Sequence, residues 1–123
     1  MTSTANAEQD VALEALNTLS DVAASSITGL TEVHAQLAEV RRRRRRGWSW
    51  RRIASSGDSP NPLASVTGIA ASLALASAGF RRALAHALRS EGMQLTKIAP
   101  LLDVSRQRIG ALLRPRREGR SPS

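Results

Sequence analysis

Apolar side chains recur at steps of three and four residues along the first forty residues of the chain, which is the spacing of one face of a helix. The pattern begins near Glu8 and predicts an acidic, amphipathic helical arm over residues 8–46 with a coiled-coil-like seam. Leu13 and Ile27 flank the seam, and Gly29 predicts a bend or a division into two helices. The predicted seam consists of Leu16, Leu19, Ala23, Leu30, Val33, Leu37 and Val40.

The seam has two interpretations. It is either an ordinary amphipathic face packed within one subunit, or the contact between the two subunits of a dimer. The only aromatic residues are Trp48, Trp50 and Phe80, so a chain of 123 residues builds a small core. A long seam on so small a core favours pairing between subunits. Residues 1–7 are small and polar, and we expect them to be disordered.

A second long helix is predicted over residues 62–91, after a loop at residues 57–61 in which Asn61 can cap the helix. Residues 59–80 carry no charge, so a membrane-spanning segment has to be considered. Serine, threonine and glycine make this segment too polar to insert well, and we expect its small residues to contact the N-terminal arm or a second subunit. Its predicted apolar stripe is Val66, Ile69, Leu73, Ala76, Phe80, Leu84 and Ala87.

The sequence LTKIAPLLDVSRQRIGALL, from Leu95 to Leu113, predicts two short helices packed at a steep angle across a tight turn. Apolar or small residues occupy the packing positions Ile98, Ala99, Leu102, Val104, Ile109 and Leu112. This stretch resembles the helix-turn-helix of bacterial DNA-binding regulators. The resemblance implies that Ala99 lets the two helices approach and that Val104 fills the corner after the turn.

The stretch departs from the family pattern in three places. Asp103 stands where glycine is usual, at a turn position with positive φ, which Asp tolerates better than most residues. Gln94 replaces the usual Ser or Thr cap, and Pro100 removes a backbone hydrogen bond to Thr96. We therefore expect a somewhat strained first helix and an intact second one.

The resemblance implies that the second short helix lies in the major groove of DNA. Arg106 and Gln107 are then placed to contact base edges, with Arg suited to guanine and Gln to adenine. Ser105 is expected to cap the helix and reach a phosphate, Arg108 to contact a phosphate, and residues 115–123 to form a flexible basic tail. The alternative is that these polar residues only solvate the outer face of a protein-binding helix. The expected DNA-binding residues are Ser105, Arg106, Gln107, Arg108, Gly110, Ala111, Arg114, Arg116 and Arg117.

The start of this motif is repeated earlier in the chain. Aligning Gly47 with Gly92 places Ile53 on Ile98, and both glycines come directly after a predicted helix. The first copy has no second helix, so residues 47–56 are predicted to be a degenerate half of a helix-turn-helix, distinct from the intact motif at residues 92–114. Trp50 and Ile53 have the spacing of core residues rather than contact residues.

The charge is strongly divided. Residues 1–40 hold six acidic and no basic side chains, whereas residues 41–123 hold all eighteen Lys and Arg and four acidic residues, a net charge of +14. The run of six arginines that ends the arm is either a solvated, dipole-favoured helix end or a phosphate-binding patch. We also consider that the acidic arm covers this run when DNA is absent. The additional phosphate contacts expected are Arg41, Arg42, Arg43, Arg44, Arg45, Arg46, Arg51 and Arg52.

These features predict an all-α, dimeric, sequence-specific DNA-binding protein, most simply a transcriptional regulator. The alternatives are a DNA-binding assembly subunit of the phage packaging type and a protein-interaction adaptor. The absence of cysteine and of catalytic motifs argues against an enzyme, a disulfide or a cysteine zinc site, and we expect no cofactor, metal, membrane or small-molecule ligand. The polar, acidic start of the chain is unlike a signal peptide, so we expect a cytoplasmic, nucleoid-associated protein.

Overall fold

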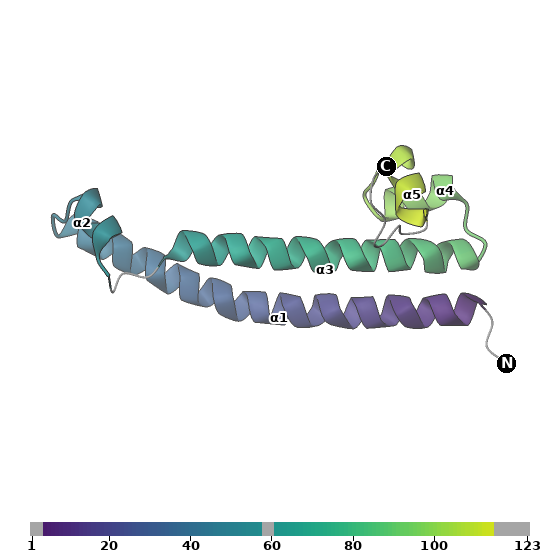
Figure 1. The fold of residues 1–123 in the computed structure, drawn as a ribbon, viewed down its shortest axis with the longest axis horizontal. Helices are drawn as coiled ribbons and strands as arrows, with labels where there is room; N and C mark the ends of the chain where they lie inside the picture. Colours follow the sequence, from purple (N-terminus) through teal and green to yellow (C-terminus); the bar gives the residue numbers. More distant parts are fainter. Residues whose placement is uncertain (1–3, 58–60, 115–123) are drawn as a thin grey trace, which may run out of the picture. The chain divides into compact units, whose positions relative to one another are not determined.

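The computed structural model describes residues 4–57 and 61–114, and these residues form helices and connecting turns without a strand (Figure 1). The prediction of an all-α protein is therefore confirmed. The helices are α1 (Thr4–Arg45), α2 (Trp50–Ser55), α3 (Pro62–Ser90), α4 (Leu95–Leu101) and α5 (Arg106–Leu113). The prediction that residues 1–7 are disordered is wrong for residues 4–7, which belong to α1. The tail at residues 115–123, with Arg116 and Arg117, lies outside the described residues.

The chain divides into two compact units, and α1 and α3 each contribute a segment to both. The first unit comprises residues 1–17 and 77–123, and the second comprises residues 18–76. The first unit therefore contains α4 and α5, and the second contains the arginine run and α2. Each unit has its own packing, which is described separately.

The first unit is built around the C-terminal half of α3, which carries α4 and α5 on one side. Its buried core is formed by Ala85 of α3, Ile98 and Ala99 of α4, Leu102 directly after α4, and Ile109 of α5. Half-buried apolar side chains that pack against this core are Leu84, Leu88, Met93, Leu95, Val104, Leu112 and Leu113. A separate cluster joins the start of α1 to α3 through small side chains, Ala12, Ala15, Ala83 and Ala87. Alternating small and large residues thus let one helix, α3, pack on two sides.

In the second unit, α1 passes Gly29 as one continuous helix, so the predicted division into two helices does not occur. Gly29 faces α3, where a Cβ atom at this position would lie 2.9 Å from Cδ1 of Ile69. The glycine therefore serves a close helix contact rather than a break. By contrast, a Cβ atom at Gly68 would meet nothing within 4 Å, so this glycine makes no close contact of that kind among the described residues, and its contact with a second subunit stays a prediction.

The predicted seam of α1 divides between two faces of the helix. Val33 is buried and Leu19 and Val40 are half-buried, on the side of α1 that also carries Gly29. Leu16, Leu30 and Leu37 remain 43–46% exposed. Part of the seam therefore packs within the chain, and pairing of its exposed part with a second subunit stays a prediction. Ala23 is half-buried between the two sets.

The predicted stripe of α3 is largely found on its packed side. Ala76 and Ala87 are buried, and Ile69, Leu73, Phe80 and Leu84 are half-buried, whereas Val66 is exposed. Helix α3 also has the length and the mean hydropathy, 1.7 over 18 residues, that a membrane-spanning helix requires. Length and composition alone support that possibility, and a core helix of a soluble protein can meet the same criteria.

Candidate nucleic-acid interface

The connection between α4 and α5 is a tight turn over residues 102–105. Asp103 has φ of 56°, which confirms the predicted left-handed conformation at this position. The Val104 amide donates to the Ala99 carbonyl at 3.1 Å, and Leu102 is buried beside them. Val104 packs against the core as its half-buried corner residue. The turn therefore fixes the direction in which α5 leaves α4.

Helix α4 is short, and its start lacks a side-chain cap. Gln94 takes the extended conformation of a cap, but its side chain makes no capping hydrogen bond, as its residue type suggested. Pro100 lies inside the helix near its end and is exposed. Ile98 is fully buried and Ala99 is 4% exposed, so packing against α5 holds a helix whose backbone is poorly supported.

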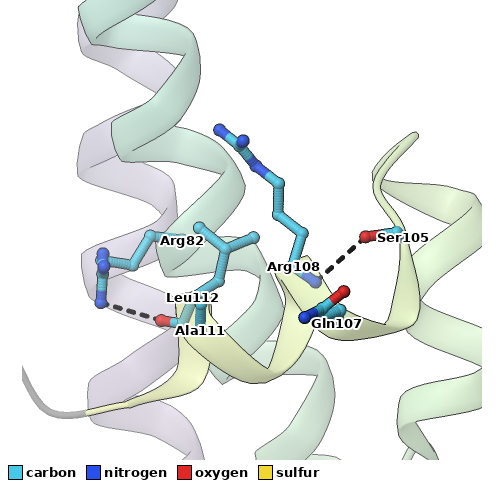
Figure 2. Close-up of a pocket in the computed structure, with 6 residues that line it drawn as sticks. All are labelled: Arg82, Ser105, Gln107, Arg108, Ala111 and Leu112. Carbon is cyan, nitrogen blue, oxygen red and sulfur yellow. Dashed lines mark hydrogen bonds between the residues drawn. The ribbon is translucent and has the colours of Figure 1, made fainter.

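Helix α5 has a well-formed start. Ser105 is the N-cap, and its Oγ atom accepts a hydrogen bond from the Arg108 amide at 3.1 Å (Figure 2). The first amides of a helix have no partner inside the helix, so those of Arg106 and Gln107 are directed outward along the axis. This end of α5 is suited to an anion because amide dipoles and neighbouring cations meet there.

The outer face of α5 is polar and exposed. Gln107, Arg108 and Ala111 are exposed, whereas Ile109 is fully buried and holds the opposite face on the core. A hollow of about 430 Å³ runs along the outer face (Figure 2). Its lining residues are Arg82, Ser105, Gln107, Arg108, Ala111 and Leu112.

The remaining predicted contact residues complete this face in part. A Cβ atom at Gly110 would meet nothing within 4 Å, so this glycine leaves space beside the helix rather than serving internal packing. Arg114 is exposed at the end of α5. Arg106 lies in the first turn of α5, but its side chain is outside the described residues. The structure therefore brings Ser105, Gln107 and Arg108 together and leaves the role of Arg106 to experiment.

Two arginines of α3 also support this site. Arg81 donates from Nε to the Leu102 carbonyl at 3.2 Å, at the end of α4. Arg82 donates from Nη1 to the Leu112 carbonyl at 2.8 Å, at the end of α5. The last carbonyls of a helix are unpaired and partly negative, so each guanidinium caps a short helix. No local pattern reveals these contacts, because 21 and 30 residues separate the partners.

Some arginines of the run in the second unit already have partners within the chain, so fewer of them are available to bind phosphate than the sequence suggested. Glu39 accepts from Arg42 at 2.6 Å and from Arg43 at 3.1 Å. These hydrogen bonds, first that from Arg42 and then that from Arg43, lower the pKa of the Glu39 carboxyl group. The guanidinium of Arg43 also lies 5.0 Å from the centre of the Trp48 ring. Arg42 and Arg43 are therefore both held by Glu39 at the helix end.

Two tryptophan rings contact further arginines at the end of α1 and in α2. The guanidinium carbon of Arg52 lies 3.6 Å from the centre of the Trp48 ring, and that of Arg44 lies 4.8 Å from the centre of the Trp50 ring. Such contacts are attractive because the ring face carries negative charge. Ile53 is buried as predicted, but Trp50 is 59% exposed, so its assignment to the core is wrong. Arg41, Arg45, Arg46 and Arg51 are exposed.

Comparison with family models, with curated proteins and with solved structures gives no match for this chain. Its function has to be inferred from its own residues. Within residues 4–57 and 61–114, no group of three or more His, Asp or Glu side chains lies close enough to hold a metal ion.

Proposed function

We propose that the chain is a sequence-specific double-stranded DNA-binding protein that acts as a dimer, most simply as a transcriptional regulator. In this proposal α4 and α5 form a helix-turn-helix, and α5 enters the major groove. The observation that carries the proposal is the outer face of α5. Gln107, Arg108 and Ala111 are exposed there, on a short helix whose opposite face is fixed to the core by Ile109.

The chemistry of this face fits a duplex. Gln107 can pair with adenine through its amide, and small side chains at Gly110 and Ala111 allow close approach of α5 to the bases. Arg108 and the capped start of the helix are suited to phosphate. Arg82 is already bonded to the end of α5, so in the proposal it positions the helix rather than contacts DNA.

The charge of the chain supports the same partner. The net charge of +14 over residues 41–123 would attract a polyanion and release counterions on binding. Binding is therefore expected to weaken steeply with salt. Three exposed arginines of the run make no ion pair or ring contact with a described residue and are candidates for further phosphate contacts: Arg41, Arg45 and Arg46.

The test begins with selection of bound sequences from random duplex DNA, followed by titration of the selected and of a scrambled duplex. Gln107→Ala should weaken binding to the selected duplex by about 1–3 kcal/mol and relax the preference at one base position. Arg108→Ala should weaken binding to both duplexes alike and reduce the dependence on salt. Arg106→Ala is expected to behave like Gln107→Ala.

The matched control is Gln94→Ala, because Gln94 is an exposed glutamine whose side chain makes no capping bond. This variant should bind as the unaltered protein does. If the chain selects no sequence, or if Gln107→Ala, Arg106→Ala and Arg108→Ala leave both titrations unchanged, α5 is not a recognition helix.

A further inference from the structure

Helix α1 carries a second row of apolar side chains on its solvent-exposed side. Leu13, Ile27 and Leu30 are 55%, 69% and 46% exposed, and Leu16 and Leu37 are each 43% exposed. Together with three small or polar residues between them, they recur at alternating steps of three and four. We name this set the outer seam, and its members are Leu13, Leu16, Ser20, Ala23, Ile27, Leu30, His34 and Leu37.

The outer seam is distinct from the face of α1 that packs within the chain. That packed face carries Ser26 and Val33, which are 6% and 4% exposed, and Gly29, which approaches Ile69 of α3. The steps of three and four along the outer seam are those of a helix that pairs with another helix over several heptads. Its large apolar members remain at least 43% exposed, and Leu37, at the end of the seam, lines a hollow with Trp50 and Ile53 of α2. A row of exposed apolar side chains at this spacing marks a contact surface.

We propose that the outer seam binds the outer seam of a second copy of this chain, with the two α1 helices antiparallel. The proposal names the contact that makes the DNA-binding dimer, so its role in recognition rests on the proposed function. A two-fold contact uses the same patch on both copies, so each residue of the seam has to find a partner within the seam.

The order of large and small residues favours the antiparallel arrangement. When the two-fold axis crosses the pair at the level of residue 25, Ser20 lies opposite the partner's Leu30 and Ala23 lies opposite the partner's Ile27. Leu13 then lies opposite the partner's Leu37. Small residues thus face large ones in the centre, and all eight positions are matched. A parallel pair in register would stack serine on serine and alanine on alanine, which leaves gaps in the contact.

The charge along α1 requires the same orientation. The helix is acidic in its first part and ends in the arginine run, and a parallel pair would place one arginine run against the other. The antiparallel pair places each run near the acidic start of the partner subunit, where Asp10 and Glu14 are exposed. Arg41, Arg45 and Arg46 are exposed and make no ion pair with any described residue, so they are available to this contact.

Glu39 pairs with Arg42 and Arg43 of its own helix, but the acidic residues in the first half of α1 cannot reach that arginine run. Helix α1 is continuous, and Asp21 and Arg41 are separated along it by about 30 Å at the rise of 1.5 Å per residue. The idea that the acidic arm covers the arginine run is therefore retained only between copies, where the antiparallel contact brings the two together.

Single cysteine variants test the orientation directly, because the chain contains no cysteine. Asn17→Cys and Thr31→Cys are both exposed positions beside the outer seam, on the same flank. In the antiparallel dimer, position 17 of one copy approaches position 31 of the other. In a parallel dimer these two positions would be about 21 Å apart by helical rise, and each would lie on the opposite flank of the pair from its own copy.

The two variants, carrying tags of different size, are oxidised separately and as a mixture, without DNA. The expected result is a mixed disulfide in the mixture and at most a trace of disulfide in either variant alone. A mixture that forms no mixed disulfide would overturn the proposal. Titration of DNA by the unaltered chain is a separate measurement, so failure here leaves the proposed function to its own test.

A charge in the seam gives an independent measurement. Ile27→Glu should raise the dissociation constant of the dimer about tenfold or more, because it places an unpaired charge in an apolar contact. Leu75→Glu is the matched control on α3, where the side chain is 78% exposed and outside the seam. Sedimentation equilibrium measures both. A chain that is monomeric at all concentrations, or that partitions into neutral lipid vesicles instead of pairing, would refute the proposal.

Discussion

The two glycine turns, one in each unit, are locally alike but have different surroundings. Gly47 and Gly92 have φ of 95° and 90°, and each ends a long helix. The next residue donates its amide to a carbonyl five residues earlier, from Trp48 to Arg43 at 3.1 Å and from Met93 to Leu88 at 3.0 Å. The repeat predicted from the sequence is therefore present as a repeated backbone structure.

A side-chain contact is repeated as well. Arg44 donates to the Trp48 carbonyl at 3.1 Å, and Arg89 donates to the Met93 carbonyl at 3.4 Å. Each arginine thus satisfies a carbonyl just beyond the end of its own helix, where the helix dipole favours a cation. The equivalence of these arginines was visible in the aligned sequence, and its physical reason is this shared cap.

The two regions differ in the packing of the short helix after the turn. After Gly92, Ile98 and Ala99 are buried by α5, whereas after Gly47, Ile53 is buried but Ala54 is exposed. At the position equivalent to Leu88, which packs against the core of the Gly92 region, the Gly47 region has Arg43 against the Trp48 ring. Local capping can therefore build the same turn twice, but only the second turn gains a core.

The largest expected effect comes from the buried isoleucine of each region. Ile98→Ala should lower the free energy of unfolding of the first unit by about 2–5 kcal/mol, because it leaves a cavity in the core shared by α4 and α5. Ile53→Ala should cost less, since α2 has no second helix to lose. Hydrogen exchange of the α4, α5 and α2 amides measures the two effects separately. Equal losses in the two variants would show that the region around Ile53, in the second unit, has a core comparable to that around Ile98.

Replacing either turn glycine with alanine should lower stability by a similar amount. Gly47→Ala and Gly92→Ala should each lower the free energy of unfolding by about 1–2 kcal/mol, since a Cβ atom is disfavoured at positive φ. A Cβ atom at either position would meet no atom within 4 Å, so the cost comes from the backbone conformation alone. Thermal unfolding followed by circular dichroism measures it. A large difference between the variants would mean that the turns are not equivalent.

The caps of the two short helices should be exchangeable. Ser49 caps α2 by accepting from the Arg52 amide at 3.1 Å, whereas Gln94 does not cap α4 with its side chain. Gln94→Ser should stabilise α4 by about 1 kcal/mol, and Ser49→Ala should destabilise α2 by a similar amount. Exchange protection of the first-turn amides measures both changes. Unchanged protection in Gln94→Ser would mean that Pro100, rather than the cap, limits α4.

The smallest expected effect on stability comes from Glu39, an acidic residue of the Gly47 region. The equivalent position in the Gly92 region is Leu84. Hydrogen bonds from Arg42 and Arg43 lower its pKa from the usual 4.5, so they favour the ionised form in the folded chain. Their contribution is present above the unfolded pKa and is lost as pH falls through the folded pKa, below 4.5.

Thermal unfolding at pH 7 and at pH 3 measures this contribution. Glu39→Gln should lower stability slightly at pH 7 and have less effect at pH 3. Glu32→Gln is the matched control, because Glu32 is exposed and makes no ion pair with a described residue. If Glu39→Gln has the same effect at both pH values, the ion pairs do not contribute to stability.

Much of the local structure was determined by the sequence alone. The helix periodicity, the turn at Gly92, the left-handed Asp103 and the cap at Ser105 all result from preferences of a few neighbouring residues. Leu95 to Leu113 therefore has the two short helices that its pattern predicted. That α5 binds DNA remains a prediction, since the same helices can carry other functions.

Only the tertiary structure decided which faces are buried. The sequence could not divide the seam of α1, because Leu19 and Leu16 have the same apolar character and differ only in whether α3 lies beside them. It could not assign Arg81 and Arg82 to the ends of α4 and α5, or show that Trp50 is exposed. Such outcomes depend on contacts between residues far apart in the chain, and no local preference encodes them.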